Sequence, residues 1–124
     1  MQRAESAEPG AVPEPDDAAV RLFTSGTTAR PKAVELSHDN LISYVMGRVE
    51  FGSASPQDAA LVCVPPYHLA GVGAAMSNIY AGRRLVYLPS FDPRAWIRLI
   101  EEEEVTTATV VPTMLDRIAS VLRM

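Results

Sequence analysis

The sequence predicts an α/β fold in which a mostly parallel sheet is flanked by helices. Short apolar runs alternate along the 124 residues with segments of helical periodicity, and this alternation is typical of parallel strands joined by crossover helices. The run Leu61-Val62-Cys63-Val64 is continuously apolar, as in strands that are covered on both faces. Because 48% of the residues are hydrophobic, the chain can bury the core of one domain.

The first elements are expected in the order strand, strand, helix. The stretch Val20-Arg21-Leu22-Phe23 predicts a short strand, and the alternating residues 34–36 are a second candidate strand. Ser37 is a suitable N-cap for a helix over residues 39–48. Leu41, Tyr44 and Val45 are expected on one face of this helix.

The remainder of the chain alternates three strands with three helices. The strands are expected at residues 59–64, 84–88 and 106–111. The helices are expected at residues 69–81, from residue 93 to the glutamate run, and at residues 114–122. Gly82 closes the first of these helices, and Asp92 followed by Pro93 begins the second. The glutamate run, Glu101–Glu104, lies at the wrong end for the helix dipole and is expected to be a solvated face.

Residues 1–18 differ from the rest of the chain. They contain three prolines and five acidic residues but almost no large apolar side chain. Such a composition cannot contribute much to a core, so a disordered Pro/Glu-rich tail or linker is expected there, followed by one domain at residues 19–124.

Charge and composition exclude several classes of protein. A net charge of −4 offers no basic surface for nucleic acid. The single cysteine, Cys63, cannot form an internal disulfide, and no CxxC or Cys/His cluster indicates a metal site, so a reduced, buried structural cysteine is expected. No apolar stretch approaches the roughly 20 residues of a membrane span, and the acidic N-terminus does not resemble a secretory signal. A cytoplasmic location is therefore expected.

The segment from residue 24 to residue 32 is the most informative part of the sequence. Four hydroxyl side chains and a glycine occupy five successive positions: Thr24, Ser25, Gly26, Thr27 and Thr28. Hydroxyls and backbone N–H groups donate to phosphate oxygens, and a turn of successive amides forms an anion-binding nest. Gly26 lets the backbone approach closely, and Lys32 supplies a mobile positive charge. These residue types indicate a polyphosphate-binding loop.

The same composition also fits an ordinary Ser/Thr-rich surface turn in which Lys32 is solvated. No GxxxxGK[ST] motif occurs in the sequence, which disfavours a P-loop NTPase, a kinase or a GTPase. Composition alone leaves the phosphate loop and the surface turn both open.

Residues Phe23 to Leu41 read FTSGTTARPKAVELSHDNL and resemble the AMP-binding signature of the adenylate-forming superfamily. That superfamily includes acyl-CoA synthetases, firefly luciferase and nonribosomal peptide adenylation domains, and its signature usually reads TSGTTGxPKG. The resemblance implies that the loop from Thr24 to Lys32 binds the phosphates of ATP and that Lys32 is catalytic. Ala29 and Ala33 stand where the family usually has glycine, and an alanine held at positive φ would cost about 1 kcal/mol.

A second stretch, VPPYHLAG at residues 64–71, resembles the family's next motif, an aromatic residue and a histidine after a proline. The resemblance implies that His68 lies near the carboxylate as a second catalytic residue, and that Tyr67, His68 and Gly71 shape the acyl pocket. Without it, a histidine at a strand end is more simply a hydrogen-bonded structural group. Residues 109–115 resemble the strand-to-helix element before the adenine site.

Later motifs of the family do not occur in this sequence. They are a Tyr-Gly-x-Thr-Glu segment whose glutamate helps to hold Mg²⁺, a ribose-binding aspartate, a hinge, and a C-terminal domain that bears a lysine. The chain is therefore expected to be an incomplete piece of the adenylate-forming N-terminal domain, with the remainder of the enzyme on the same or another chain. The isolated chain is expected to be inactive.

The resemblance implies a segment of an ATP-dependent carboxylic acid–CoA ligase that forms an acyl-adenylate, with Mg²⁺ required and coenzyme A as co-substrate. A fatty acid is the expected substrate, because the small residues after His68 leave space and offer no charged partner for an amine. No metal ligand is assigned in this chain. The alternatives are a truncated, catalytically inactive remnant that binds nucleotide weakly or pairs with another protein, and a truncation product that folds poorly.

Overall fold

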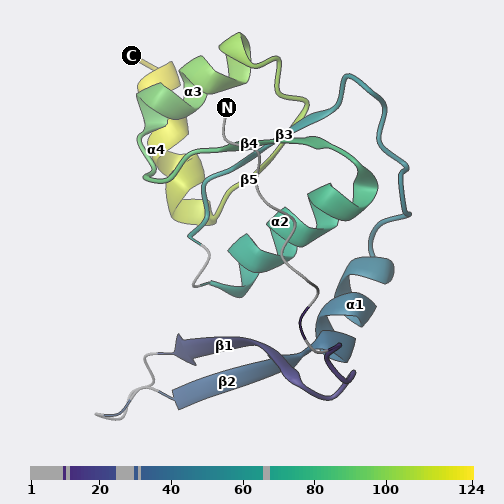
Figure 1. Cartoon of the computed structure of the whole chain (residues 1–124). Helices are drawn as coiled ribbons and strands as arrows, with labels where there is room; N and C mark the ends of the chain where they lie inside the picture. The colour runs from purple at the N-terminus through teal and green to yellow at the C-terminus, as the bar shows by residue number, and fades with distance from the viewer. Residues whose placement is uncertain (1–9, 11, 25–29, 31, 66–67) are drawn as a thin grey trace.

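The computed structural model describes residues 10, 12–24, 30, 32–65 and 68–124. In this part of the chain the strands form two sheets, a two-stranded sheet β1-β2 and a three-stranded sheet with the order β4-β3-β5 (Figure 1). The strands are β1 (Ala18–Thr24), β2 (Lys32–Ser37), β3 (Ala59–Val62), β4 (Arg84–Tyr87) and β5 (Thr107–Thr109). The helices are α1 (His38–Met46), α2 (Leu69–Ala81), α3 (Pro93–Glu102) and α4 (Pro112–Leu122).

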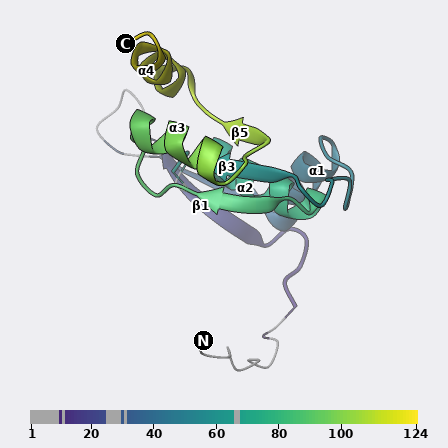
Figure 2. The same cartoon turned by 90° about the horizontal axis from the view of Figure 1, so that it is seen from above.

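The three-stranded sheet confirms the α/β prediction. Strand β3 pairs in parallel with β4 on one side and with β5 on the other, and each of the three strands precedes a helix. The chain moves from β3 to β4 and then returns across β3 to β5. Right-handed crossovers in opposite directions place their helices on opposite faces. Accordingly α2 lies on one side of the sheet, and α3 packs beside α4 on the other (Figures 1 and 2).

The core is centred on β3 and the two residues that follow it. Every residue from 59 to 64 has an exposed fraction of 2% or less, and Leu61, Val62 and Val64 are the largest fully buried side chains. This burial explains why the sequence of β3 is apolar without alternation.

The first two strands do not join this sheet. Strands β1 and β2 pair antiparallel as a separate hairpin, in which Leu22 lies opposite Val34 and Arg21 opposite Glu35. Residues directly opposite each other in an antiparallel pair point to the same face, so the side chains of Leu22 and Val34 share one face of the hairpin. The sequence predicted both strands but not their antiparallel pairing.

The predicted tail contains residues that contact α1. The backbone carbonyls of Pro15 and Asp17 accept hydrogen bonds of 3.0 and 3.1 Å from the first two N–H groups of α1. These bonds satisfy donors that a helix leaves unpaired at its N-terminus. Residues 1–9 and 11 lie outside the described residues, so the disordered tail at residues 1–18 stays a prediction.

Local capping signals locate the helix ends. The hydroxyl of Ser37 accepts from the Asn40 N–H at 3.1 Å, and the Asn40 side chain accepts from the Ser37 N–H at 3.1 Å, which forms a capping box. Asp92 caps α3 by accepting from the Ala95 N–H at 2.8 Å. Gly82 ends α2 in the left-handed conformation, with φ of 82°. All three predicted caps are confirmed.

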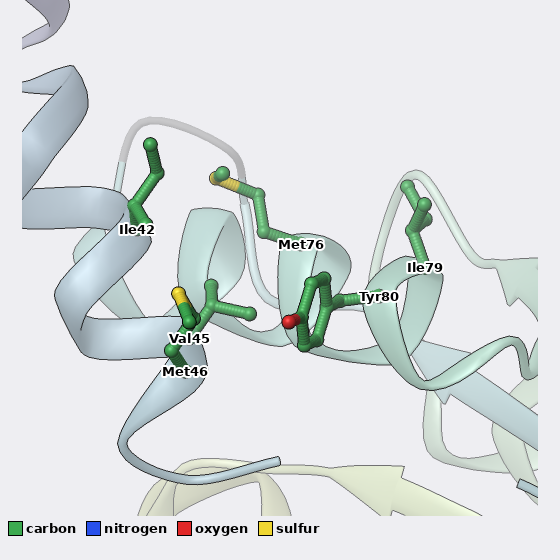
Figure 3. A pocket seen from close by; sticks show the side chains of 6 residues that line it. All are labelled: Ile42, Val45, Met46, Met76, Ile79 and Tyr80. Atoms are coloured by element: carbon green, nitrogen blue, oxygen red, sulfur yellow. The ribbon is translucent and has the colours of Figure 1, made fainter. Parts of the chain in front are cut away.

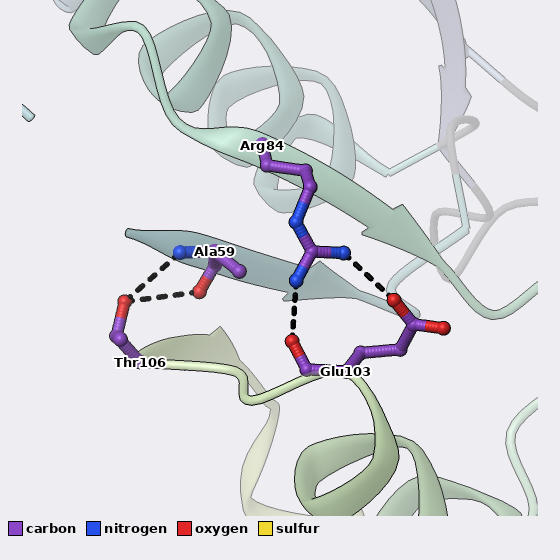
Figure 4. A network of polar contacts seen from close by, with 4 residues as sticks. All are labelled: Ala59, Arg84, Glu103 and Thr106. Carbon is purple, nitrogen blue, oxygen red and sulfur yellow. Dashed lines mark hydrogen bonds and ion pairs between the residues drawn. The ribbon is translucent and has the colours of Figure 1, made fainter. Parts of the chain in front are cut away.

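Polar contacts join the ends of β3, β4 and β5 (Figure 4). The Thr106 hydroxyl accepts from the Ala59 N–H and donates to the Ala59 carbonyl, each at 3.1 Å. The Arg84 guanidinium donates to the Glu103 carboxylate at 2.7 Å and also to the Glu103 backbone carbonyl. Glu101, Glu102 and Glu104 are exposed, as expected for a solvated face. The half-exposed Glu103 in addition ties the end of α3 to β4.

Candidate functional site

The predicted phosphate loop connects the two strands of the hairpin. Thr24, the last residue of β1, lies opposite Lys32, the first residue of β2, so the antiparallel pairing closes the loop at its base and holds Lys32 there. The residues between them that carry the hydroxyls, Ser25, Thr27 and Thr28, lie outside the described residues, as does Gly26. Their contacts with phosphate stay a prediction.

The structure describes Ala33 but not Ala29, the two alanines that stand where the family signature usually has glycine. Ala33 lies within β2 and pairs with Phe23, and Glu104 is the non-glycine residue that has a positive φ in the described part of the chain. Because Ala33 adopts an extended conformation open to any residue, its side chain carries no conformational penalty. Ala29 lies outside the described residues.

An open cavity of about 590 Å³ lies beyond the carboxyl ends of β3 and β5. It is lined by Val64, Pro65, His68, Leu69, Ala70, Val111 and Met114. Two of these residues follow β3, one follows β5, and the others belong to the starts of α2 and α4. The chain leaves β3 toward one face of the sheet and leaves β5 toward the other. Neighbouring strands with such divergent connections form a crevice, which is the usual ligand site of open α/β sheets.

The backbone holds His68 at the mouth of this cavity. His68 is the N-cap of α2, in an extended conformation with φ of −105° and ψ of 142°. Its N–H donates to the Pro65 carbonyl at 3.0 Å, and its own carbonyl accepts from Gly71 and Val72 at 3.0 and 3.2 Å. The histidine backbone is therefore fixed between the end of β3 and the first turn of α2.

The cavity is apolar apart from His68. None of its lining residues carries a carboxylate, an ammonium or a guanidinium group. Met114, which lines it, has its sulfur 3.8 Å from the sulfur of Cys63. Burial raises the pKa of the Cys63 thiol, so the thiol stays protonated near neutral pH and does not act as a nucleophile. The arrangement suits an apolar organic group that ends near an imidazole.

The structure brings some of the predicted site residues together. The end of β1 and the start of α2 lie on the same side of the molecule (Figures 1 and 2). Gly71 is buried in the first turn of α2, behind the residues that line the cavity. Tyr67 lies outside the described residues.

Sequence reasoning missed a second cavity, of about 280 Å³, between α1 and α2 (Figure 3). Ile42, Val45 and Met46 of α1 face Met76, Ile79 and Tyr80 of α2 across it. The exposed fractions of Ile42, Met46 and Ile79 are 51%, 61% and 65%. The feature of the sequence that could have indicated this cavity is that Ile42, Met46 and Ile79 are apolar although they lie outside the buried face of their helices. None of the predicted site residues lines this cavity.

The described residues contain no group of three or more His, Cys, Asp or Glu side chains that could hold a metal ion. Within the same residues, no helix has the length and apolar character to cross a membrane.

Comparisons with known proteins agree with this geometry. The sequence matches the family described as AMP-binding enzyme over residues 2–124. A 2-succinylbenzoate–CoA ligase of Arabidopsis thaliana, chloroplastic or peroxisomal, is 34% identical over 108 residues, which are 87% of this chain and 19% of that protein. The 2-succinylbenzoate–CoA ligase of Bacillus licheniformis is 37% identical over 106 residues, which are 85% of this chain and 22% of that protein.

A solved structure also matches the fold of this chain. The crystal structure of ATP-bound MatB from Rhodopseudomonas palustris superimposes with a TM-score of 0.73 at 36% identity, covering 86% of this chain and 21% of that one. The chain thus spans about a fifth of the length of the curated relatives that it matches.

Proposed function

Because the chain belongs to the AMP-binding enzyme family, we propose that it is the part of an ATP-dependent carboxylic acid–CoA ligase that holds the triphosphate and forms one wall of the acyl pocket. The observation that carries the proposal is the apolar cavity at the carboxyl ends of β3 and β5, with His68 at its mouth. Relatives whose names describe CoA ligases, and a relative crystallised with ATP, support it.

The reaction has two steps. A carboxylate oxygen attacks the α-phosphorus of ATP, the bond to the bridging oxygen breaks, and pyrophosphate leaves with that electron pair. The thiol of coenzyme A then attacks the acyl carbonyl, loses its proton, and AMP leaves. In the first step negative charge moves onto the leaving pyrophosphate, so donors and cations around the β- and γ-phosphates lower the barrier.

The hairpin loop has the residues for this task. In the proposal Thr27, Thr28 and Lys32 contact the β- and γ-phosphates, and Thr24, Ser25 and Gly26 supply the rest of the nest. Lys32 stands at the base of the loop, opposite Thr24, where strand pairing limits the movement of its backbone. Charge-assisted hydrogen bonds of this kind contribute roughly 1.5–3 kcal/mol each.

The cavity has the residues for the acid. In the proposal His68 faces the carboxylate and orients it toward the α-phosphorus, and Tyr67 forms a further part of the wall. The apolar lining favours an acyl group without charge. A fatty acid is the proposed substrate on these grounds, and an aromatic acid is the competitor, since two relatives are named for 2-succinylbenzoate.

The test is acid-dependent exchange of labelled pyrophosphate into ATP. The protein expressed from the complete reading frame that encodes this chain is incubated with ATP, Mg²⁺ and, in turn, straight-chain fatty acids, 2-succinylbenzoate, other aromatic acids and amino acids. Exchange with apolar acids and formation of a thioester after coenzyme A is added are expected. Exchange with amino acids alone contradicts the apolar pocket, and no exchange with any acid contradicts the ligase and favours the inactive remnant.

A further inference from the structure

At Gly71 the first turn of α2 lies directly against the backbone that follows β3. A Cβ atom placed on Gly71 would lie 2.3 Å from the Pro65 carbonyl oxygen, 2.7 Å from the Val64 carbonyl oxygen and 2.9 Å from the Pro65 carbonyl carbon. All three are backbone atoms, so no side-chain rotation relieves the contact. The first turn of α2 can lie where it does only because residue 71 lacks a side chain.

The conformation of the backbone does not explain this glycine. Gly52 and Gly82 are the glycines with positive φ in the described part of the chain, so Gly71 keeps an ordinary helical conformation. Alanine is also the better residue for a helix interior. Close approach is thus the physical reason for glycine at this position.

Val64, one of the two residues that the added Cβ would meet, is held in place by the core. Val64 is 2% exposed and continues the buried run that starts at Ala59. Interiors packed at crystal-like density transmit a displacement and do not absorb it. Because the Val64 carbonyl oxygen also lies 2.7 Å from the added Cβ, movement of the half-exposed Pro65 alone would not relieve the contact. A side chain at position 71 would therefore displace the start of α2.

The start of α2 carries the residues that face the cavity. His68, Leu69 and Ala70 line it, and the His68 backbone is hydrogen-bonded both to Pro65 and to Gly71. Relieving a separation of 2.3 Å to an ordinary contact of 3.4 Å requires a shift of about 1 Å, and misplacing a group at a reacting centre by about 1 Å can lower a rate about a hundredfold.

We propose that Gly71 is a positioning residue, which sets the location of His68 relative to the acid by letting the first turn of α2 rest on the backbone of Val64 and Pro65. The inference rests on the proposed function for the role of His68 in catalysis. It goes beyond that function because Gly71 does not contact the substrate in this proposal. Gly71 instead fixes the position of the first turn of α2, which carries His68.

The first test is a double-mutant cycle on the protein from the complete reading frame, with Gly71→Ala, His68→Ala and the double variant. Gly71→Ala is expected to lower kcat/KM for the acid about 10- to 100-fold and to leave the apparent KM for ATP unchanged. If Gly71 acts through His68, the double variant is no worse than His68→Ala alone. Losses that multiply show independent effects and overturn the proposal.

Gly73→Ala is the matched control. A Cβ at Gly73, in the same helix, would lie 2.8 Å from the Tyr44 ring, but that ring is a side chain and can rotate away. Gly73→Ala is expected to leave kcat/KM for the acid unchanged. An equal loss in both variants, or a Gly71→Ala protein that does not fold, means that the glycine serves only the fold and overturns the proposal.

A second readout does not depend on activity. Ring signals of ¹³C-histidine-labelled protein, assigned by their loss in His68→Ala and in His38→Ala, report on His68 with His38 as internal reference. Gly71→Ala is expected to move the His68 ring signals and not those of His38, and Gly73→Ala to move neither. Unchanged His68 signals overturn the proposal. If the wild-type protein shows no acid-dependent exchange, the proposed function has failed, and these spectra still decide the role of Gly71.

Discussion

Replacing Thr106 with valine tests how the buried start of β3 is satisfied. The Thr106 hydroxyl accepts from the Ala59 N–H and donates to the Ala59 carbonyl, each at 3.1 Å (Figure 4). Ala59 is 0% exposed. Its carbonyl keeps another donor, the Thr106 N–H at 2.9 Å, whereas the hydroxyl is the acceptor that the structure gives to its N–H. Valine has nearly the same shape as threonine and removes only that acceptor.

The magnitude follows from the burial of the donor. A buried donor left without a partner costs about 1–3 kcal/mol. Thr106 itself is exposed, so water can reach part of the site, and we expect a loss near the lower end, about 1–1.5 kcal/mol. Valine is as suitable as threonine at the edge of a strand, so strand propensity adds little.

The assay combines urea unfolding with native-state hydrogen exchange. Thr106→Val should lower the free energy of unfolding and speed exchange of the Ala59 amide relative to that of Leu61 in the same strand. Thr106→Ser keeps the hydroxyl and is the control. Equal stability of the valine and serine variants, with unchanged protection of Ala59, would refute the assignment of the hydroxyl as the partner of that N–H.

Three further predictions follow from the structure. Gly82→Ala should lower the free energy of unfolding by about 1 kcal/mol, because φ is 82° while the nearest atom to a new Cβ is 3.9 Å away; an unchanged urea midpoint contradicts this. Burial raises the pKa of the Cys63 thiol, so iodoacetamide should react slowly at pH 8. Rapid labelling of the native protein would refute the burial argument. Because the raised pKa favours the protonated form in the native state, the thiol's contribution to the free energy of unfolding is complete below its ordinary pKa of about 8.5. This contribution is lost as the pH rises through the raised pKa of the native state. The 124-residue chain alone should release no acid-dependent pyrophosphate above a Lys32→Ala control, and release would show that the family's magnesium-holding glutamate is dispensable.

Local signals made most of the elements predictable. The hydroxyl of Ser37, the Asp92-Pro93 pair and Gly82 each act within one turn of the backbone, and all three lie where the sequence indicated. The order of strands and helices follows from apolar periodicity, which depends only on neighbouring residues. These features need no knowledge of what each element packs against.

Long-range pairing was not predictable in the same way. The antiparallel hairpin depends on Leu22 meeting Val34, and short apolar strands do not specify their partner or its direction. The hydrogen bond between Arg84 and Glu103 joins residues 19 positions apart, so the sequence of the glutamate run did not reveal this contact. The cavity at the ends of β3 and β5 required the strand order, and only the structure gives it.

The structure also explains two residues of the predicted motifs. Ala33, a departure from the family signature, carries no penalty because it lies in an extended strand. Gly71, which the resemblance places at the acyl pocket, is buried against the backbone of Val64 and Pro65. A sequence pattern reports which residue a position requires, but not whether the requirement comes from a ligand or from packing.

The most direct test of the account is a pair of apparent KM series, one for ATP and one for the acid, on Lys32→Ala and His68→Ala in the protein from the complete reading frame. Arg21→Ala, which removes an exposed ion pair with Glu35 on the same hairpin, is the control and should change neither series. Lys32→Ala should weaken the use of ATP about 10- to 100-fold, since each 1.4 kcal/mol corresponds to roughly a factor of ten. His68→Ala should instead impair the use of the acid. If Lys32→Ala leaves the use of ATP unchanged, or if both variants give the same profile, the division between a phosphate loop and an acyl pocket is wrong, and a surface turn with a structural histidine is the better description.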